Sequence, residues 1–450
     1  MKNILMLFCL PALLTACGGG KGGAPAVNDA APVVAATLES SDSEAAPLDQ
    51  PEGEPVTEAV DSDAVQDAPV DFTVRNYFPE GSGVAPLTDD AGASASLDPQ
   101  AAGSLQLLYV SPAGSDSNPG TIERPFRSLI RAAKASRAGG KVLVAPGVYE
   151  GGFRTNASGA PGARILFLST RKWGAKIIPS ENSPNKTAWD NRGSHVDIVG
   201  FEIDGSAYQR GKKWVHGIYN GGSYVAIRNN HVHHIAQTAA CTHAGGAAIG
   251  VDSYYGGVKG DVISNLVHDI GPAGCRFVQG IYVSTSGRVQ NNVIYRVAEG
   301  GIHLWHDANN VIITNNTVTQ SNTGIIIGGG NYYHSSGPND HTAVYSNIVY
   351  DNKMGISEQG QTGRNNTYRN NLVYQNARYD WRLQNGLSHT GTVSAAPLFL
   401  DNSRSSDPSL KLSADSPAVG HATPEYAESI DFAGRPRDAR AGYDIGALQH

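Results

Sequence analysis

The sequence has few cysteines, and the apolar run at its start is short. Only four cysteines occur among 450 residues, and two of them, Cys9 and Cys17, lie within the first seventeen. The apolar run from position 4 to 14 is too short to span a bilayer, which excludes a transmembrane helix there. Cys241 and Cys275 remain, and in an oxidising cell envelope we expect them to form a disulfide between neighbouring repeat units. Two buried free thiols are the alternative.

The first residues have the pattern of an export signal. A basic Lys2 precedes the apolar run, and small residues precede Cys17. This pattern resembles a bacterial lipoprotein signal, which implies that residues 1–16 are removed and that Cys17 carries the lipid, including palmitate. Gly18 after the cysteine favours the outer membrane by the same resemblance. An ordinary secretory signal that happens to contain cysteine is the alternative.

Residues 17–105 lack a periodic apolar pattern and are rich in Ala, Pro, Gly, Ser and acidic residues. Such a composition cannot bury enough surface to offset chain entropy, so we expect a disordered tether. From residue 18 the tether carries sixteen acidic residues against Lys21 and Arg75, a net charge of −14. Because the whole chain carries −7 and the signal +1, residues 106–450 carry +6. A basic domain suits an anionic polymer, although solubility alone could also explain the charge.

A strand–turn sequence motif, which we call the repeated phrase, occurs six times between His216 and Asn376. Each unit opens with a small residue before isoleucine and closes with asparagine before an aliphatic pair. A period of 24 to 35 residues between these asparagines, with short Val/Ile runs, predicts a solenoid whose rungs stack. We expect the asparagines to form a structural ladder, because stacked amides share hydrogen bonds between rungs. The openings end at Ile218, Ile249, Ile281, Ile302, Ile325 and Ile356, and the closings are Asn230, Asn265, Asn292, Asn316, Asn347 and Asn371.

Ahead of the repeats the pattern predicts a strand over 107–111, a helix between Pro125 and Gly139, and a strand over 141–149. An amphipathic helix in this position would cover the open end of the solenoid core. The residues 109–116, 119–121, 125–126 and 146–149, with the ending at 434–438 and 444–447, resemble right-handed parallel β-helix proteins. That group includes pectate-lyase-like and alginate-lyase-like enzymes. The resemblance covers about residues 107–450 and implies an all-β, single-stranded right-handed parallel β-helix with an N-terminal capping helix.

If each opening isoleucine points inward, alternation sends two columns of side chains outward. One column contains Tyr219, Gly250, Tyr282, His303, Ile326 and Ser357, and the next contains Gly221, Asp252, Ser284, Trp305, Gly328 and Gln359. Glu358 would then point inward, which suggests that the core opens near the last rung. His306 would also point inward unless the chain bends, and the turn-like sequence after it makes a bend plausible. Ten of the fourteen histidines lie between His216 and His341.

The Tyr/His/Trp patch predicts a polysaccharide site. β-Elimination on a uronate needs a neutralised carboxylate, a base for the C5 proton and an acid for the leaving oxygen. We predict Tyr282, His303, His306 and Arg276 as catalytic residues. The alternative is that the aromatic residues only stack on the surface and that the basic residue is only a solvated surface charge. The predicted substrate-binding residues are Tyr219, Asp252, Tyr254, Lys259, Arg288, Trp305, Tyr332 and Tyr333. Tyr332 and Tyr333 lie in the longest stretch between the opening isoleucine and the closing asparagine of one unit, Ile325 to Asn347. There they would either stack on sugars or pin the loop.

Cofactor chemistry is not expected. Calcium-dependent β-helix pectate lyases gather carboxylates, whereas those of residues 216–376 are scattered, so calcium is doubtful although Asp252 lies in a suitable column. His231 and His233 share a strand face, but no partner follows at a diagnostic spacing, so we expect no metal. Paired aspartates for hydrolysis are also missing. Only His306-Asp307 echoes the Asp-Pro-His-Asp motif of β-helix mannuronan epimerases.

Together these features predict an outer-membrane lipoprotein that cleaves an acidic polysaccharide by β-elimination. A noncatalytic polysaccharide-binding β-helix, an epimerase and a glycoside hydrolase are the alternatives, because fold does not fix function. We expect the acidic polysaccharide and the membrane as partners, no nucleic acid, and a monomer.

Overall fold

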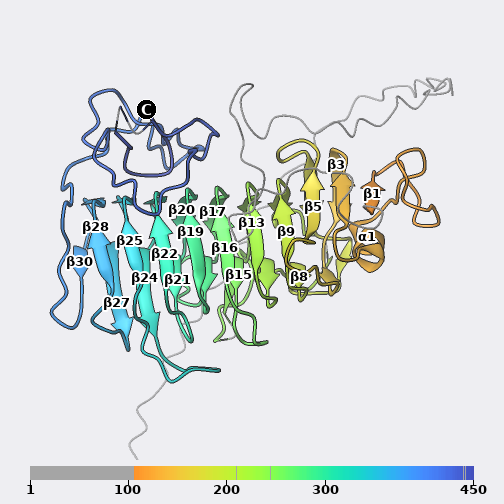
Figure 1. Ribbon diagram of the computed structural model, residues 1–450, viewed down its shortest axis with the longest axis horizontal. Coiled ribbons are helices and arrows are strands. Elements are labelled where there is room, and N and C mark those ends of the chain that lie inside the picture. Colours follow the sequence, from red (N-terminus) through yellow and green to blue (C-terminus); the bar gives the residue numbers. More distant parts are fainter. Residues whose placement is uncertain (1–105, 209, 244, 439, 441) are drawn as a thin grey trace, which may run out of the picture. The chain divides into compact units, whose positions relative to one another are not determined.

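Short Val/Ile strands alternate with turns, and each turn of the chain lays its strands on the preceding one. The computed structural model describes residues 106–450 except 209, 244, 439 and 441. Within them, parallel strands build three long sheets of ten, nine and nine strands. The predicted right-handed parallel β-helix is confirmed (Figure 1). The predicted signal, Cys17 and the tether lie outside the described residues.

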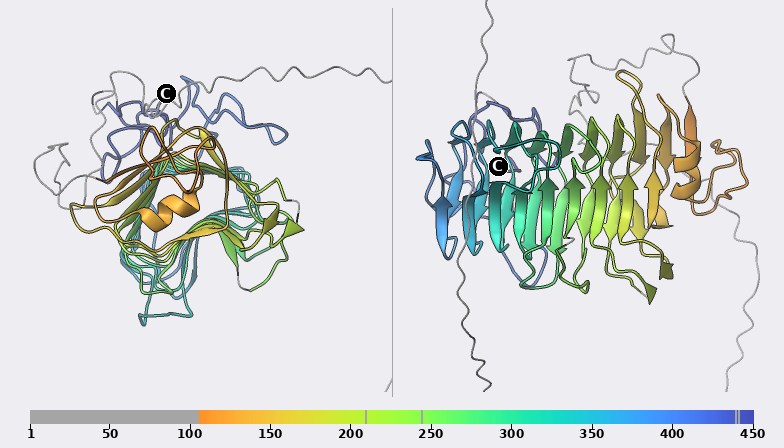
Figure 2. Two further views of the ribbon diagram at one scale, coloured as in Figure 1. Left: turned by 90° about the vertical axis from the view of Figure 1, so that its right-hand side faces the viewer. Right: turned by 90° about the horizontal axis from the view of Figure 1, so that it is seen from below.

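The three sheets run side by side along the solenoid (Figure 2). In spatial order the first sheet contains β1 (Leu107–Val110), β2 (Lys141–Val144), β5 (Ile165–Ser169), β9 (Val196–Val199), β13 (Val225–Arg228), β16 (Gly260–Ile263), β19 (Gly287–Gln290), β22 (Val311–Thr314), β25 (Ala343–Tyr345) and β28 (Thr367–Arg369). The second sheet contains β3 (Gly147–Glu150), β6 (Ala175–Ile178), β10 (Glu202–Asp204), β14 (His231–His233), β17 (Leu266–Ile270), β20 (Val293–Val297), β23 (Thr317–Thr319), β26 (Ile348–Tyr350) and β29 (Leu372–Tyr374). The third sheet contains β4 (Phe153–Thr155), β8 (Thr187–Asn191), β12 (His216–Asn220), β15 (Gly246–Val251), β18 (Val278–Val283), β21 (Gly300–Leu304), β24 (Thr323–Gly329), β27 (Met354–Gly360) and β30 (Tyr379–Arg382). A small pair, β7 (Asn182–Ser183) and β11 (Arg210–Gly211), lies beside them.

The predicted register of the third sheet is confirmed. The six opening isoleucines pair with one another across neighbouring strands, and none of them is exposed. Inward Ile and Val residues of the other two sheets meet them in one continuous core. The outward column therefore places Tyr219, Gly250, Tyr282 and His303 on adjacent rungs.

The asparagine ladder is also confirmed. From Asn230 to Asn371, each side-chain Nδ2 donates to Oδ1 of the next asparagine over 2.9–3.1 Å. The same Oδ1 accepts from the backbone N–H of the preceding ladder residue, so each amide joins two rungs. The residue before a ladder asparagine takes a left-handed backbone conformation, for example Asn229 and Ser264, each with φ of 56°.

The N-terminal helix α1 (Leu129–Ala135) caps one end of the core (Figure 2, left). It is shorter than predicted, because Ser128 caps it by accepting from the Arg131 N–H, and Pro125 and Phe126 precede it. Leu129 and Ala132 are buried in the main core, whereas Ile130 is exposed. The strand expected over 141–149 divides at Ala145-Pro146 into β2 and β3, which belong to different sheets.

At the other end, the expectation that the core opens at Glu358 is wrong. Glu358 is 1% exposed, and its carboxylate accepts hydrogen bonds from the Tyr368 hydroxyl at 2.7 Å and the Gln384 backbone N–H at 2.7 Å. These bonds satisfy a charge that burial would otherwise penalise. The C-terminal segment then packs on the second sheet, where its Leu410, Leu412, Ile445 and Ala447 meet strand residues (Figure 1).

The predicted disulfide between Cys241 and Cys275 is present, with the two Cα atoms 5.6 Å apart. It joins the segments that precede β15 and β18, neighbouring strands of the third sheet. Among the described residues, no helix has the length and apolar character needed to cross a membrane.

Candidate active site

The outward surface of the third sheet carries a cluster of tyrosine and histidine side chains, which we call the Tyr–His face. It consists of Tyr282, His303, His306 and Tyr333, with Tyr219 two rungs away from Tyr282. Strands β18 and β21 place Tyr282 and His303 directly opposite each other, with ring centroids 5.6 Å apart and edge to face. The predicted contact between these two residues is therefore observed.

The imidazole of His303 is closed off by its neighbours. Neither ring nitrogen is accessible, and neither has a hydrogen-bond partner among the described residues. Burial, and then the nearby His306, lower the pKa of His303 to about 3, so the ring is neutral at pH 7. A neutral imidazole offers one N–H donor and one acceptor. An unsatisfied buried polar group is costly, and ligand binding is one reason to retain it.

Tyr282 faces His303 as a neutral phenol. Burial, followed by the negative charge of Asp252, raises the pKa of Tyr282 well above its usual value. The hydroxyl therefore keeps its proton at physiological pH and can donate it. This is the protonation state that a general acid needs before the reaction.

His306 reaches the same face because the chain bends there, as the turn-like sequence predicted. Its φ of 49° lies in the left-handed region. Its Nδ1 lies 2.7 Å from the Asn331 carbonyl oxygen, so Nδ1 carries the proton and donates. The Nε2 is then left to accept from the hydroxyl of Tyr333, also at 2.7 Å. Tyr333 and His306 thus form a directed donor–acceptor pair.

Tyr333 is presented by the loop that follows β24. Asp307 holds this loop, since it accepts from the backbone N–H groups of Tyr333, His334 and Ser335 and from the Ser335 hydroxyl. The Ser253 hydroxyl also donates to Asp307, at 2.8 Å, which ties the loop to an earlier rung. Burial, and then the charges of Asp252 and Asp307, raise the pKa of Tyr333 to about 12.

The two loop tyrosines have different surroundings. Tyr333 stays 38% exposed, stacks on His306 and meets the ring of Tyr254 at 5.2 Å. The ring of Tyr332 packs against Gly337 of its own loop, and its hydroxyl donates to the Gln361 Oε1 at 3.2 Å. Tyr332 therefore pins the loop, whereas Tyr333 belongs to the Tyr–His face.

The carboxylate of Asp252 is engaged in hydrogen bonds that hold residues of the Tyr–His face and its surroundings in place. Its carboxylate accepts from the Tyr219 hydroxyl at 2.9 Å, the Ser284 hydroxyl at 2.6 Å and the Tyr254 N–H at 3.0 Å. The ring of Trp305 lies against glycines of neighbouring rungs, since a Cβ at Gly330 or Gly360 would lie 3.3 or 2.8 Å from it. The small residues make room for the indole, which remains half-buried.

Three predicted cations lie elsewhere. Arg276 precedes β18 and neighbours Glu299, at the opposite end of the strand from Tyr282. Arg288 belongs to the first sheet and forms an ion pair with Asp261 at 2.6 Å. Lys259 directly precedes β16 of the same sheet. The structure does not bring any of the three to Tyr282 and His303.

Sequence reasoning missed Arg192 and His216. The Arg192 guanidinium lies 3.6 Å from the ring centroid of Tyr255 and 4.8 Å from that of Tyr219, and it pairs with Asp190. His216 packs edge-on against Tyr219, and burial lowers its pKa to about 4. Arg192 precedes the first repeated phrase, so the repeat alone could not place it. Its partner Asp190 lies opposite Tyr219 in the pairing of β8 with β12, which only the structure shows.

Gly250 is the position of the outward column without a side chain between Tyr219 and Tyr282 on adjacent strands, and it is buried. A Cβ added there would meet Tyr219 Cδ2 at 3.7 Å and His216 Nδ1 at 3.8 Å, which are ordinary contacts. Aromatic side chains therefore flank a position that has room for a methyl group.

Comparisons with known proteins agree with this architecture. The family model described as periplasmic copper-binding protein (NosD) matches residues 190–396, and a model of unknown function (DUF1565) matches residues 112–154. The uncharacterized protein YwoF of Bacillus subtilis (strain 168) is 32% identical over 145 residues, which cover 30% of this chain and 31% of that protein. This chain thus spans less than a third of its curated relative.

Solved structures share the fold at low identity. Pectate lyase Pel9A superposes with a TM-score of 0.51 at 18% identity over 77% of this chain and 96% of that chain. An alginate lyase from Paenibacillus sp. str. FPU-7 gives 0.47 at 17% identity over 65% and 96%. A rhamnogalacturonan lyase gives 0.45 at 16% identity over 71% and 97%. The predicted resemblance to the pectate-lyase-like β-helix group is confirmed at the level of fold.

Proposed function

We propose that this protein cleaves an acidic, uronate-containing polysaccharide by β-elimination on the Tyr–His face. The observation that carries the proposal is the hydrogen bond from the Tyr333 hydroxyl to His306, within reach of the protonated Tyr282 and the unpartnered His303. The β-helix fold, which several polysaccharide lyases share, supports it by analogy.

The first step is removal of the proton at C5 of the uronate. In the proposal the Tyr333 oxygen accepts this proton while its own proton passes to His306 Nε2. The imidazole is suited to this because its Nδ1–H already donates to a carbonyl, which leaves Nε2 unprotonated. A phenol with a raised pKa is a stronger base once its proton has moved.

The second step is departure of the oxygen at C4. Tyr282, held neutral by burial and by Asp252, donates its proton to that oxygen as the C4–O bond breaks. A double bond then joins C4 and C5. The ring nitrogens of His303 are enclosed in the free protein, so in the proposal substrate binding displaces a neighbouring side chain and lets the His303 N–H reach the uronate carboxylate. The charge of that carboxylate must be offset before C5 becomes acidic enough. Its neutral state means that this stabilisation comes from a hydrogen bond rather than from a full charge.

Binding extends along the third sheet in the direction in which the rungs stack. In the proposal one sugar unit lies over Gly250, which has no side chain, and Tyr219 and Arg192 lie beyond it. The net charge of +6 on residues 106–450 favours an anionic chain. We also propose the cell envelope as the location and Cys17 as the lipidated residue. The leader sequence and the periplasmic description of the matching family model support this location.

The test is a screen of purified protein against a panel of uronate polymers. Ultraviolet absorbance from the unsaturated uronate should appear on at least one polymer and be lost in Tyr282→Phe. Binding of the same polymer, measured by calorimetry, should persist in that variant. Binding without any new absorbance across the panel would favour the noncatalytic carbohydrate-binding alternative and exclude the lyase.

A further inference from the structure

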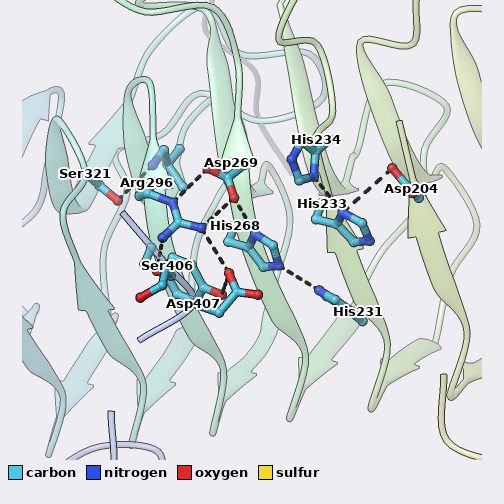
Figure 3. A network of polar contacts seen from close by, with 12 residues as sticks. Asp204, His231, His233, His234, His268, Asp269, Arg296, Ser321, Ser406 and Asp407 are labelled. Atoms are coloured by element: carbon cyan, nitrogen blue, oxygen red, sulfur yellow. Dashed lines mark hydrogen bonds and ion pairs between the residues drawn. The ribbon is translucent and has the colours of Figure 1, made fainter. Parts of the chain in front are cut away.

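A second cluster of titratable side chains lies on the second sheet, away from the Tyr–His face. Strand β14 sends His231 and His233 outward on either side of the buried Val232. Register pairs His233 with His268 on β17, and Asp204 on β10 lies on the other side (Figure 3). Four histidines and three carboxylates, Glu202, Asp204 and Asp269, gather here.

The imidazoles approach each other more closely than stacking requires. Nε2 of His231 lies 2.7 Å from Nε2 of His268. The ring of His233 is nearly parallel to that of His268, with centroids 5.1 Å apart and an interplanar angle of 9°. One ligand atom from each of these three residues lies within 4.8 Å of the others.

Neighbouring carboxylates orient two of the three rings. Asp269 Oδ2 lies 2.6 Å from Nδ1 of His268, so Nδ1 donates and Nε2 is left with its lone pair facing His231. For His233, Nε2 lies 3.2 Å from Glu202 Oε1 and Nδ1 lies 2.7 Å from Nδ1 of His234, so a metal ion would replace one of these two contacts. A carboxylate behind an imidazole is the usual second layer of a metal site, because it fixes the tautomer and increases the basicity of the ring.

The carboxylates themselves are already engaged by cations. Arg296 holds Asp269 through two hydrogen bonds of 2.7 Å, and Lys176 bridges Glu202 and Asp204 at 2.9 and 2.7 Å. Two other combinations, Asp204 with His233 and His234, and His234 with His268 and Asp269, would have to break these pairs. The three imidazoles are therefore the most available ligand set.

We propose that His231, His233 and His268 bind one late first-row divalent metal ion, of the class of Cu²⁺ or Zn²⁺. Imidazole nitrogen suits these ions, whereas calcium and magnesium prefer oxygen. A metal–nitrogen bond of about 2.0–2.1 Å in tetrahedral geometry places two ligand nitrogens roughly 3.3 Å apart. The rings of His231 and His268 need to separate only slightly to admit the ion between them.

The site is held firmly and is open on one side. His233 and His268 are 7% and 4% exposed, while His231 is partly exposed and offers access to solvent. His268 also stacks on Tyr295, with ring centroids 4.7 Å apart. The C-terminal segment supports this end, since Asp407 accepts from Arg296 at 3.2 Å (Figure 3). Asp407 also accepts from the Tyr295 hydroxyl at 3.2 Å.

The experiment uses the full chain, freed of metal with a chelator and titrated with CuCl₂ or ZnCl₂ in a calorimeter. One equivalent should bind, and MgCl₂ and CaCl₂ should not compete. With Cu²⁺, the electron paramagnetic resonance spectrum should show coupling to imidazole nitrogens. His268→Gln and His231→Gln should each lower the affinity at least tenfold, and Asp269→Asn should lower it by about 10- to 100-fold.

His341→Gln is the matched control, because His341 is exposed and lies outside the cluster. It should leave binding unchanged. Thermal unfolding of each metal-free variant shows whether it is folded. Folded His231→Gln and His268→Gln proteins that bind copper as the parent does would overturn the proposal, as would the absence of saturable binding by the parent. In either case the cluster is a hydrogen-bonded histidine stack only.

Discussion

Single side chains of the Tyr–His face act through their protonation states. His303 is neutral because it is buried, and His306 has a defined tautomer because its Nδ1 faces the Asn331 carbonyl. Neither property can be read from the sequence His303-Leu304-Trp305-His306, since both depend on residues of later rungs. The sequence could predict that these side chains meet, but not which nitrogen of His306 accepts a proton.

The neighbouring tyrosines of the loop give a matched pair of substitutions. Tyr333→Phe removes the hydroxyl that donates to His306, so we expect activity to fall about 10²- to 10⁴-fold, the usual contribution of a proton-transfer group. Tyr332→Phe removes only the bond to Gln361 and should leave most of the activity. Steady-state rates on the polymer identified by the screen measure both. Equal activity of Tyr333→Phe and the parent would rule out the Tyr333–His306 relay.

The low pKa of His303 makes stability depend on pH. Its pKa is about 3 in the folded state and about 6.5 in an unfolded chain, so the unfolded state binds the proton more readily. The contribution to stability is complete above pH 6.5 and is lost as the pH falls toward 3. His303→Gln should weaken this dependence, by an amount on the order of a few kcal/mol at most. Urea unfolding of both proteins at pH 7 and pH 5 measures it, and parallel losses would contradict the assignment.

Columns of equivalent residues are the most predictable elements of this fold. The repeated phrase predicted the inward isoleucines, the outward Tyr219, Tyr282 and His303, and the asparagine ladder. The same repeat also aligns two histidines of the second sheet. His233 and His268 each follow a ladder asparagine, Asn230 and Asn265, by three residues, so the ladder already aligned them. Spacing along the chain hid this pair, because strand register rather than sequence distance brings the two rings together.

Strand register also explains why the three predicted basic residues do not lie beside Tyr282. Arg276 and Arg288 each lie six residues from Tyr282, but Arg276 precedes the start of β18 and Arg288 belongs to the first sheet. Lys259 lies about one rung earlier, directly before a strand of the first sheet. The neighbours of a residue are those one rung away. Asp190 and Arg192 of the preceding rung illustrate this, and they lie before the first repeated phrase.

The ladder predicts a graded response to substitution. In Asn316→Ala, the backbone and side-chain N–H groups of Asn292 lose their acceptor and the Val289 carbonyl loses a donor. We expect a loss of about 2 to 3 kcal/mol in the free energy of unfolding, since buried groups are left unsatisfied. Asn371→Ala removes the corresponding bonds to Asn347 and Val344, but no bond to a following ladder asparagine among the described residues, so it should cost less. Denaturant unfolding compares the two, and equal costs would show that position in the ladder does not matter.

Gly250 tests whether the polymer follows the outward column. Gly250→Ala should fold and bind normally, because its Cβ makes ordinary contacts. Gly250→Leu should fill the position between Tyr219 and Tyr282 and raise the dissociation constant of the polymer at least about tenfold, the cost of losing roughly 1.4 kcal/mol of binding. Calorimetry with the polymer, alongside thermal unfolding, measures this. Unchanged binding in a folded Gly250→Leu variant would place the polymer elsewhere.

At the scale of the whole folded unit, the three sheets have different surroundings. The C-terminal segment covers part of the second sheet, while the loop after β24 borders the Tyr–His face of the third (Figure 1). The disulfide between Cys241 and Cys275 joins segments that lead into that third sheet. The fold thus leaves one lateral surface for a polymer and a separate one for the proposed metal ion.

The proton NMR spectrum of a uronate polymer after incubation with the protein tests for β-elimination on the Tyr–His face. β-Elimination creates a carbon–carbon double bond, so we expect an olefinic H4 signal that grows with the parent protein and is absent with Tyr282→Phe. Inversion at C5 without that signal would identify an epimerase, and new reducing ends without it would identify a hydrolase. Either spectrum, or one unchanged on every polymer that the protein binds, would contradict β-elimination on the Tyr–His face.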